Sequence, residues 1–146
     1  MKRIVLALIV LVASAAPGAA TTKMPSTSSL TSLASNPLVS SLMSSGLNAN
    51  QATGGAGSLL GLAQEKLTKT DWSKIAKVIP GTSSLISQAK TLGGIKKFGS
   101  LASLAPAFGK MGLSTDQVKS VQGQVSDTIS KGGGADLAKK FDGAMK

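Results

Sequence analysis

The chain has 146 residues and a formal net charge of +10, and 42% of its residues are hydrophobic but only 3% are aromatic. It contains no cysteine, histidine or tyrosine, which excludes disulfide bonds, a thiolate nucleophile, a Ser-His-Asp triad and a His/Cys zinc site. We therefore expect a protein that is not an enzyme and that holds no metal and no cofactor.

The first 20 residues have the pattern of a secretory signal peptide. Lys2 and Arg3 form a positive segment, Ile4–Val12 is an apolar run, and small residues follow it. Cleavage is expected after Ala20, with Ala15 as the competing position. An N-terminal membrane anchor is the alternative, but the apolar run is far shorter than the roughly 20 residues that span a bilayer. The pattern predicts a protein that is periplasmic or secreted by a bacterial cell.

The exported chain is expected to begin with a flexible leader, residues 21–29, and to stay basic. Loss of the two positive charges of the signal lowers the net charge from +10 to +8. The lysine doublets Lys96-Lys97 and Lys139-Lys140 are candidate contacts for an anionic lipid or polysaccharide, and a merely solvated positive surface is the alternative. We expect no binding of nucleic acid, because no arginine remains and aromatic surface is almost absent.

From Leu30 onward, apolar residues recur at helical spacing, without the alternation typical of strands. The prediction is an all-α fold, a compact bundle of six or seven short helices that forms a single domain over residues 30–146. The first helical stretch is interrupted at Asn36-Pro37. We expect a fresh helix start there, because proline fits the first turn of a helix.

Two abrupt corners between helices have the same pattern. Gly46 can end one helix in the left-handed conformation, and Asn48 can cap the next helix with Gln51 completing a capping box. The same order of residues occurs 66 positions later, where Ser114 and Gln117 form the second box. Whether the two corners reflect an internal duplication stays open.

The helix predicted after the first corner carries the strongest apolar stripe in the chain, yet four glycines lie within it. Each glycine costs a helix about 1 kcal/mol relative to alanine, so packing must compensate. Gly54, Gly57 and Gly61 share one face. This face is interpreted either as a tight helix crossing inside the domain or as a docking groove for a partner or a second copy of the chain.

Short helices are predicted through the rest of the chain. The residues expected to start or end the next two helices are Thr70, Pro80-Gly81, Thr82 or Ser83, and Gly93-Gly94. Their buried positions are expected at Trp72, Ile75, Ala76, Ile79, Leu85, Ile86 and Ala89. The small side chains imply close packing and no roomy apolar pocket.

A further apolar stripe contains a proline. Its members are Ile95, Phe98, Leu101, Ala102, Ala105 and Phe108. Because Pro106 lies within it, we expect a kink or a helix restart at residues 104–106. Beyond the second corner, a seam is predicted at Val118, Val121, Val125 and Ile129, then a hinge at Gly132–Gly134, then a short helix with Leu137, Phe141 and Met145.

Catalytic patterns are weak. The six acidic residues are dispersed, and Asp136 and Asp142 are expected on different faces of a helix, so a hydrolase with paired carboxylates is the least favoured hypothesis. The glycine-rich run lacks the order of a phosphate-binding loop. Ser87-x-x-Lys90 lies on a short helix with an ordinary exposed lysine.

Several segments carry a family resemblance. They are Asn50–Leu60, Leu67, Asp71-Trp72, Ile79-Pro80-Gly81, Leu101–Leu104, Phe108, Met111–Ser114 and Lys131-Gly132-Gly133. Over roughly Leu42 to Met145, the chain resembles the VcgC/VcgE family of bacterial domains of unknown function. Pro106 and Lys96-Lys97 depart from the family pattern. The resemblance implies an exported helical domain without an assigned activity, and it supplies no catalytic residues.

Two functions follow from these observations. The favoured one is a non-enzymatic exported domain that binds an envelope component or a protein partner. The alternative is a cationic protein that associates with an anionic membrane or polysaccharide, because the exported chain has a net charge near +8, the +10 of the whole chain less the two charges of the signal.

Overall fold

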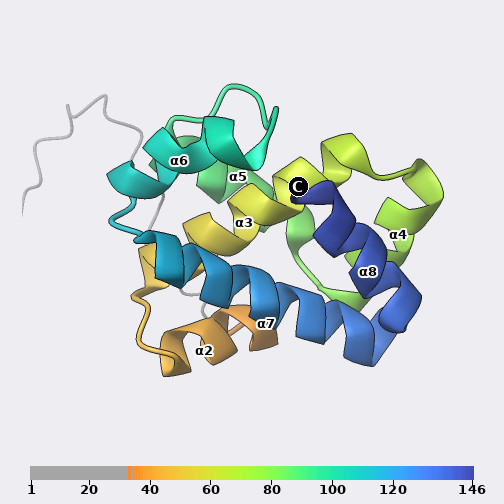
Figure 1. Cartoon of the computed structure of the whole chain (residues 1–146). Helices are drawn as coiled ribbons and strands as arrows, with labels where there is room; N and C mark the ends of the chain where they lie inside the picture. Colours follow the sequence, from red (N-terminus) through yellow and green to blue (C-terminus); the bar gives the residue numbers. More distant parts are fainter. Residues whose placement is uncertain (1–32, 34) are drawn as a thin grey trace, which may run out of the picture.

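The structure is a computed structural model that describes residue 33 and residues 35–146 (Figure 1). The predicted signal peptide and leader lie outside these residues. The described part is all-α, as predicted, and contains no strand. Its seven helices are α2 (Pro37–Ser44), α3 (Ala49–Lys66), α4 (Lys69–Val78), α5 (Thr82–Gly93), α6 (Leu101–Lys110), α7 (Thr115–Gly133) and α8 (Ala135–Ala144).

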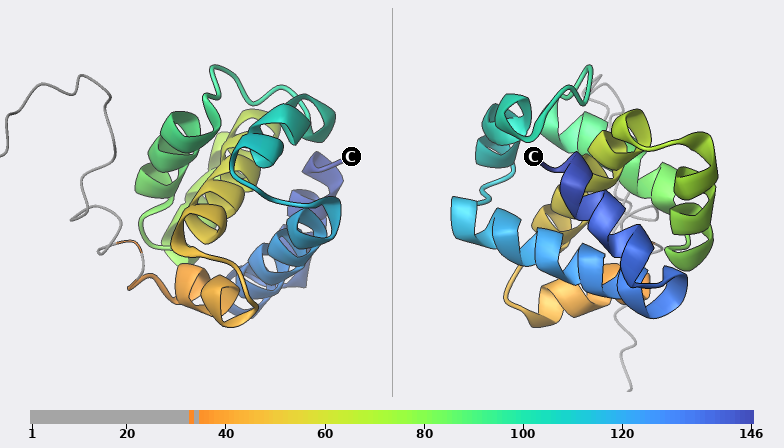
Figure 2. Two further views of the ribbon diagram at one scale, coloured as in Figure 1. Left: turned by 90° about the vertical axis from the view of Figure 1, so that its left-hand side faces the viewer. Right: turned by 45° about the vertical axis from the view of Figure 1, so that its right-hand side comes forward.

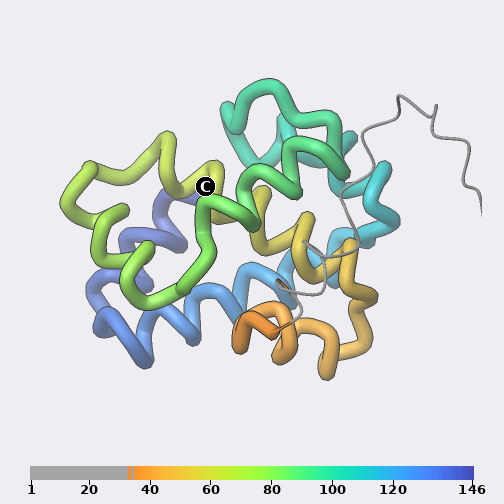
Figure 3. The backbone as a smooth tube through the Cα atoms, turned by 180° about the vertical axis from the view of Figure 1, so that it is seen from behind, coloured from red at the N-terminus to blue at the C-terminus, as the bar shows by residue number. Residues whose placement is uncertain are grey.

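Helix α3 lies at the centre of the described bundle. Every residue from Ala52 to Ala63 is buried, so this helix is covered on all sides by the others. Helices α5 and α7 lie on opposite sides of α3 (Figure 2). Helices α4 and α8 gather at one end of the molecule and α6 at the other, a division also visible from behind (Figure 3). The large apolar side chains of the core are distributed over all seven helices.

Both predicted corners are confirmed. The N–H of Gln51 donates to the Asn48 side chain at 2.9 Å, and the Asn48 N–H donates to Gln51 Oε1 at 3.1 Å. Ser114 and Gln117 form the second capping box. The two corners also touch each other, because Gln51 Nε2 donates to the carbonyl of Gly112 at 2.8 Å. Neighbouring corners hold α2, α3, α6 and α7 together at one place.

The fresh start at Asn36-Pro37 is confirmed, since the Asn36 side chain accepts the Leu38 N–H at 3.0 Å. Two other predicted caps are wrong. Helix α4 is capped by Thr68 and not by Thr70, because Thr68 has the spacing that reaches the N–H of Asp71. Helix α5 has no side-chain cap, and Thr82 is its buried first residue after a left-handed Gly81. In α4, Ile75 is buried and Trp72 is half-buried.

The predicted stripe across Pro106 is wrong. Residues 95–100 are not helical, and α6 begins at Leu101 because Ser100 and Ser103 form a third capping box there. The helix then continues through Pro106 without a restart. Proline is tolerated because it is the sixth residue of the helix and deprives only the exposed Ala102 of a hydrogen bond to its carbonyl. Leu104, Ala107 and Phe108 form the buried face, whereas Ala102 and Ala105 are exposed.

The seam of α7 and the terminal helix are confirmed. Val118, Val121, Val125 and Ile129 are buried, as are Leu137, Phe141 and Met145. The three-residue hinge is wrong. Gly132 and Gly133 are the last residues of α7, and Gly134 alone, with φ 93°, separates the two helices. No helix in the described residues combines the length and the apolarity needed to cross a bilayer.

Candidate functional site

The glycine face of α3 packs against the rest of the same chain. Gly54, Gly57 and Gly61 are all buried. A Cβ atom placed on Gly57 would lie 2.5 Å from the carbonyl carbon of Leu85 and closer still to its oxygen. On Gly61 it would lie 2.5 Å from the Phe98 ring. These glycines let the backbone of α5 and the Phe98 ring approach α3, and this face has no room for a partner.

The doublet Lys96-Lys97 lies in the segment between α5 and α6, and both side chains are exposed. The structure adds Lys110, from the end of α6, to the same place. The three lysines line a pocket of about 260 Å³, which we call the basic pocket. Its other lining residues are Gly93, Gly94, Ile95, Ser103, Leu104, Pro106 and Ala107. No acidic residue belongs to this lining.

Two features of the basic pocket favour a bound anion, whereas the carbonyl ends of α5 and α6 beside it favour a cation. None of the three lysines forms an ion pair with a described residue, since the single ion pair found there joins Lys140 to Asp71. The backbone N–H groups of Lys96 and Lys97 have no hydrogen-bond partner within the described residues. Unpaired ammonium groups and free backbone N–H groups are the donors that bind phosphate and carboxylate groups.

Contacts of Phe98 with Lys90 and Glu65 anchor the segment that carries the doublet. The ammonium of Lys90 lies over the Phe98 ring, 5.6 Å from its centroid. The N–H of Phe98 donates to Glu65 Oε1 at 3.3 Å. Phe98 is thus held in the core by its ring and by its backbone, which fixes the position of the neighbouring Lys97.

The sequence does not indicate that Lys110 lies near Lys96 and Lys97, because it stands alone, 13 residues after Lys97. It reaches the pocket because α6 folds back over the end of α5, which brings its ammonium beside Gly94. The carbonyl groups at the end of a helix favour a cation, so the last turns of α5 and α6 are suitable places for Lys90 and Lys110. The only local indication of a role for Lys110 is its position at the end of a predicted helix.

The second predicted doublet has a different setting. Lys139 and Lys140 lie on α8, and neither lines the basic pocket. Lys140 Nζ lies 3.0 Å from both carboxylate oxygens of Asp71, which ties α8 to α4. This hydrogen bond, with one from the Thr68 hydroxyl, lowers the pKa of Asp71, although burial acts in the opposite direction. Both lysines are exposed, but Lys140 is paired with Asp71 and Lys139 has no ion pair with a described residue.

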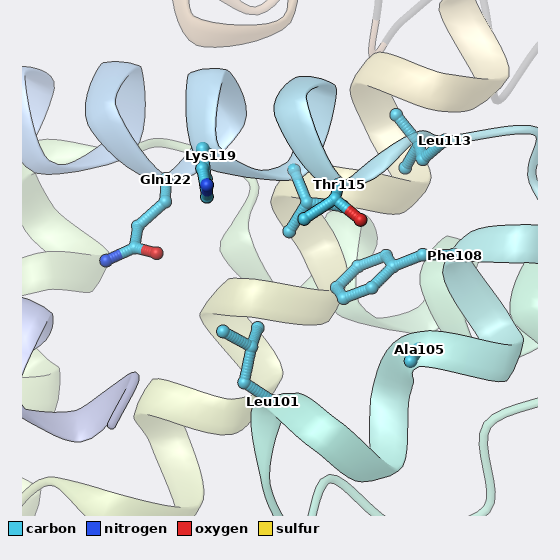
Figure 4. Close-up of a pocket in the computed structure, with 8 residues that line it drawn as sticks. Leu101, Ala105, Phe108, Leu113, Thr115, Lys119 and Gln122 are labelled. Carbon is cyan, nitrogen blue, oxygen red and sulfur yellow. The ribbon is translucent and has the colours of Figure 1, made fainter.

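An apolar hollow of about 200 Å³ lies between α6 and α7 (Figure 4). Leu101, Phe108, Leu113 and Val118 supply its apolar surface, and Ala105, Thr115, Lys119 and Gln122 complete its lining. Like the basic pocket, the hollow is smaller than the roughly 300–1,000 Å³ of small-molecule sites. It is large enough for one side chain or a short stretch of acyl chain.

Two of the six dispersed acids lie in one hollow. Asp127 and Asp142 both line an open hollow of about 330 Å³ beside α7 and α8, and the Ser126 hydroxyl donates to Asp142 at 2.9 Å. Asp127 is exposed and Asp142 is only half-buried, so this hollow does not enclose a pair of carboxylates. No group of three acidic side chains among the described residues is placed to hold a metal ion.

Comparison with known proteins gives a family and no function. Neither the curated proteins nor the solved structures include one that matches the chain. The family described as "Protein of unknown function VcgC/VcgE (DUF2780)" matches residues 7–141. The match begins well before Leu42, where the resemblance in the sequence becomes visible, and it takes in both corners, the glycine face and the basic pocket. The chain therefore belongs to the VcgC/VcgE family.

Proposed function

We propose that this protein is an exported, non-enzymatic helical domain that binds an anionic component of the bacterial cell envelope in the basic pocket. The observation that carries the proposal is the convergence of Lys96, Lys97 and Lys110 on one pocket whose lining has no acidic residue. Export, to the periplasm or out of the cell, rests on the pattern of the first 20 residues.

The chemistry of the pocket selects the class of ligand. Lysine ammonium groups act as point charges, without the planar fork of arginine, so they suit phosphate, sulfate and carboxylate groups in varied orientations. The N–H groups of Lys96 and Lys97, which have no partner among the described residues, are two further donors in the segment that lines the pocket. The absence of histidine and cysteine from the chain, and the exposure of Asp127, favour binding over catalysis.

The test uses inorganic pyrophosphate as the probe and the protein purified from cells. Backbone N–H resonances of Lys96 and Lys97 should shift on titration, and Lys96→Gln, Lys97→Gln and Lys110→Gln combined should weaken binding at least tenfold, since each lysine near an anionic surface contributes about 1 kcal/mol. Binding should also fall in about 0.5 M salt, because salt screens charges.

A matched control removes the same charge elsewhere. Lys69, Lys131 and Lys139 are exposed lysines on α4, α7 and α8 that do not line the basic pocket. Their combined replacement by Gln should leave pyrophosphate binding within about twofold, because long-range charge effects are screened. Equal losses in both triple variants, or no binding by the unaltered protein, would refute the basic pocket as the site.

A further inference from the structure

We propose that the anionic component is the surface of a phospholipid bilayer and that α6 lies on it, with the basic pocket on the phosphates. This inference rests on the proposed function and adds the identity of the partner. The inference is argued from the surface of α6 outside the basic pocket.

Helix α6 lies at the surface, yet its outer side carries only small apolar residues. Its inner side buries Leu104, Ala107 and Phe108. Its outer side exposes the positions i, i+3, i+4 and i+7, which are Ala102, Ala105, Pro106 and Gly109. Between Leu101 and Gly109 the single polar side chain is that of Ser103. A soluble helix normally carries charged residues on its outer side, so α6 departs from the usual pattern.

The two flanks of α6 differ in chemistry. One flank supplies Ser103, Pro106 and Lys110 to the basic pocket. The opposite flank supplies Leu101, Ala105 and Phe108 to the apolar hollow beside α7 (Figure 4). Cationic and apolar surfaces therefore lie next to each other across a single helix. A bilayer surface offers anionic phosphates and, just below them, acyl chains, so it can contact both kinds of surface.

This arrangement favours a bilayer over a soluble anion. A free phosphate or an acidic polysaccharide would use the lysines but would leave the apolar flank without a partner. On a membrane, the outer side of α6 and the half-exposed Leu101 meet the acyl region, and the hollow accepts a short stretch of chain. Lys119, at the α7 side of the hollow, adds a fourth cation for the headgroups.

Charge also restricts which membrane is bound. Lysines at a surface are attracted to anionic lipids and not to zwitterionic ones. The inference therefore predicts binding to vesicles that contain phosphatidylglycerol and little binding to vesicles of phosphatidylcholine alone. Equal binding to both vesicles would overturn it.

The decisive experiment places a tryptophan on the outer side of α6. In Ala102→Trp, the new indole should shift its emission to the blue with phosphatidylglycerol vesicles and should be quenched by lipids with brominated acyl chains. The matched control is Ala135→Trp, at an exposed position that begins α8. The half-buried Trp72 is common to both variants, so its emission can be subtracted as measured in the unaltered protein.

A second pair of substitutions separates this inference from the proposed function. Ala102→Gln with Ala105→Gln keeps good helix formers at exposed positions, so the variant is expected to fold. It should bind phosphatidylglycerol vesicles about tenfold more weakly, because the apolar contact is lost, and should bind pyrophosphate as before.

The outcomes of these experiments distinguish the proposed anion site from the bilayer inference. If pyrophosphate binds in the basic pocket but the tryptophan at position 102 is neither shifted nor quenched, the bilayer inference is wrong and the anion site stands. If pyrophosphate fails to bind while the tryptophan is quenched, the proposed anion site is wrong, and the inference that rests on it fails in this form.

Discussion

The close approach of α5 to α3 makes Gly57→Ala the most informative single substitution. A Cβ atom at this position would lie 2.5 Å from the carbonyl carbon of Leu85 and 2.9 Å from Ala89 Cβ. Carbon atoms in ordinary contact are about 3.5 Å or more apart, so the two helices must separate by about 1 Å. The obstacle is backbone, which cannot rotate away.

The expected magnitude follows from two opposing effects. Forcing extra volume into a packed core costs about 3 kcal/mol when the surroundings cannot yield. Alanine in place of glycine inside a helix returns about 1 kcal/mol. Gly57→Ala should therefore lower the free energy of unfolding by about 2 kcal/mol, the difference of these two effects.

Gly123→Ala measures the gain in helix stability on replacing glycine by alanine, without the clash. Gly123 lies within α7 and is exposed, and a methyl group on it would meet no neighbouring side chain within 4 Å. This variant should be about 1 kcal/mol more stable than the unaltered protein. Urea unfolding followed by circular dichroism gives both values. A Gly57→Ala variant as stable as Gly123→Ala, with an unchanged dependence on urea, would refute the packing of α5 against α3.

The other two glycines of this face should give a graded series. At Gly61 the obstacle is the ring of the buried Phe98, which can move only by disturbing the core. At Gly54 it is the sulfur of Met111, at the end of a flexible side chain. We expect the loss of stability on substitution by alanine to decrease in the order Gly57, Gly61, Gly54. Any other order would show that the side of α3 facing each neighbour is misassigned.

Three further predictions concern other polar groups. Thr53 Oγ1 is buried without a hydrogen-bond partner among the described residues, so Thr53→Val should raise the free energy of unfolding by about 1 kcal/mol in urea titrations. The Asp71–Lys140 pair lowers the pKa of Asp71 below its ordinary value of 3.8, so its stabilisation is complete above that pH and is lost as the pH falls through the lower, folded-state pKa. Lys140→Gln should therefore be less stable than the unaltered protein at neutral pH and equally stable once Asp71 is protonated, as urea titrations at both pH values would show. Ser114→Ala removes the cap that binds the Gln117 N–H and should cost about 1 kcal/mol.

Each of these has an outcome that contradicts it. A less stable Thr53→Val variant would mean that the hydroxyl has a partner. A deficit of Lys140→Gln that persists at low pH would mean that the lysine stabilises the fold by packing and not by its charge. An unaffected Ser114→Ala variant would mean that the second corner does not depend on its capping box.

The helices and corners could be predicted because their determinants are local. The corner residues Asn48 and Gln51 need only each other and the intervening turn, so their order in the sequence specifies the capping box. The valine seam of α7 is likewise visible as a spacing. The starts of α4 and α6 also have local determinants, namely Thr68 three residues before Asp71 and the capping box of Ser100 and Ser103.

The site required the tertiary structure. Spacing showed that three glycines share one face of α3, but the close packing of α5 decides that this face is internal. Nothing in the sequence joins Lys110 to Lys96 and Lys97, or separates Lys140 from them by pairing it with Asp71. Residues distant in the chain meet only through the packing of whole helices, which depends on the fit of many side chains at once. The sequence alone thus determined the two corners, the valine seam and the charge that the protein carries, whereas packing decided which of those charges converge and which are paired.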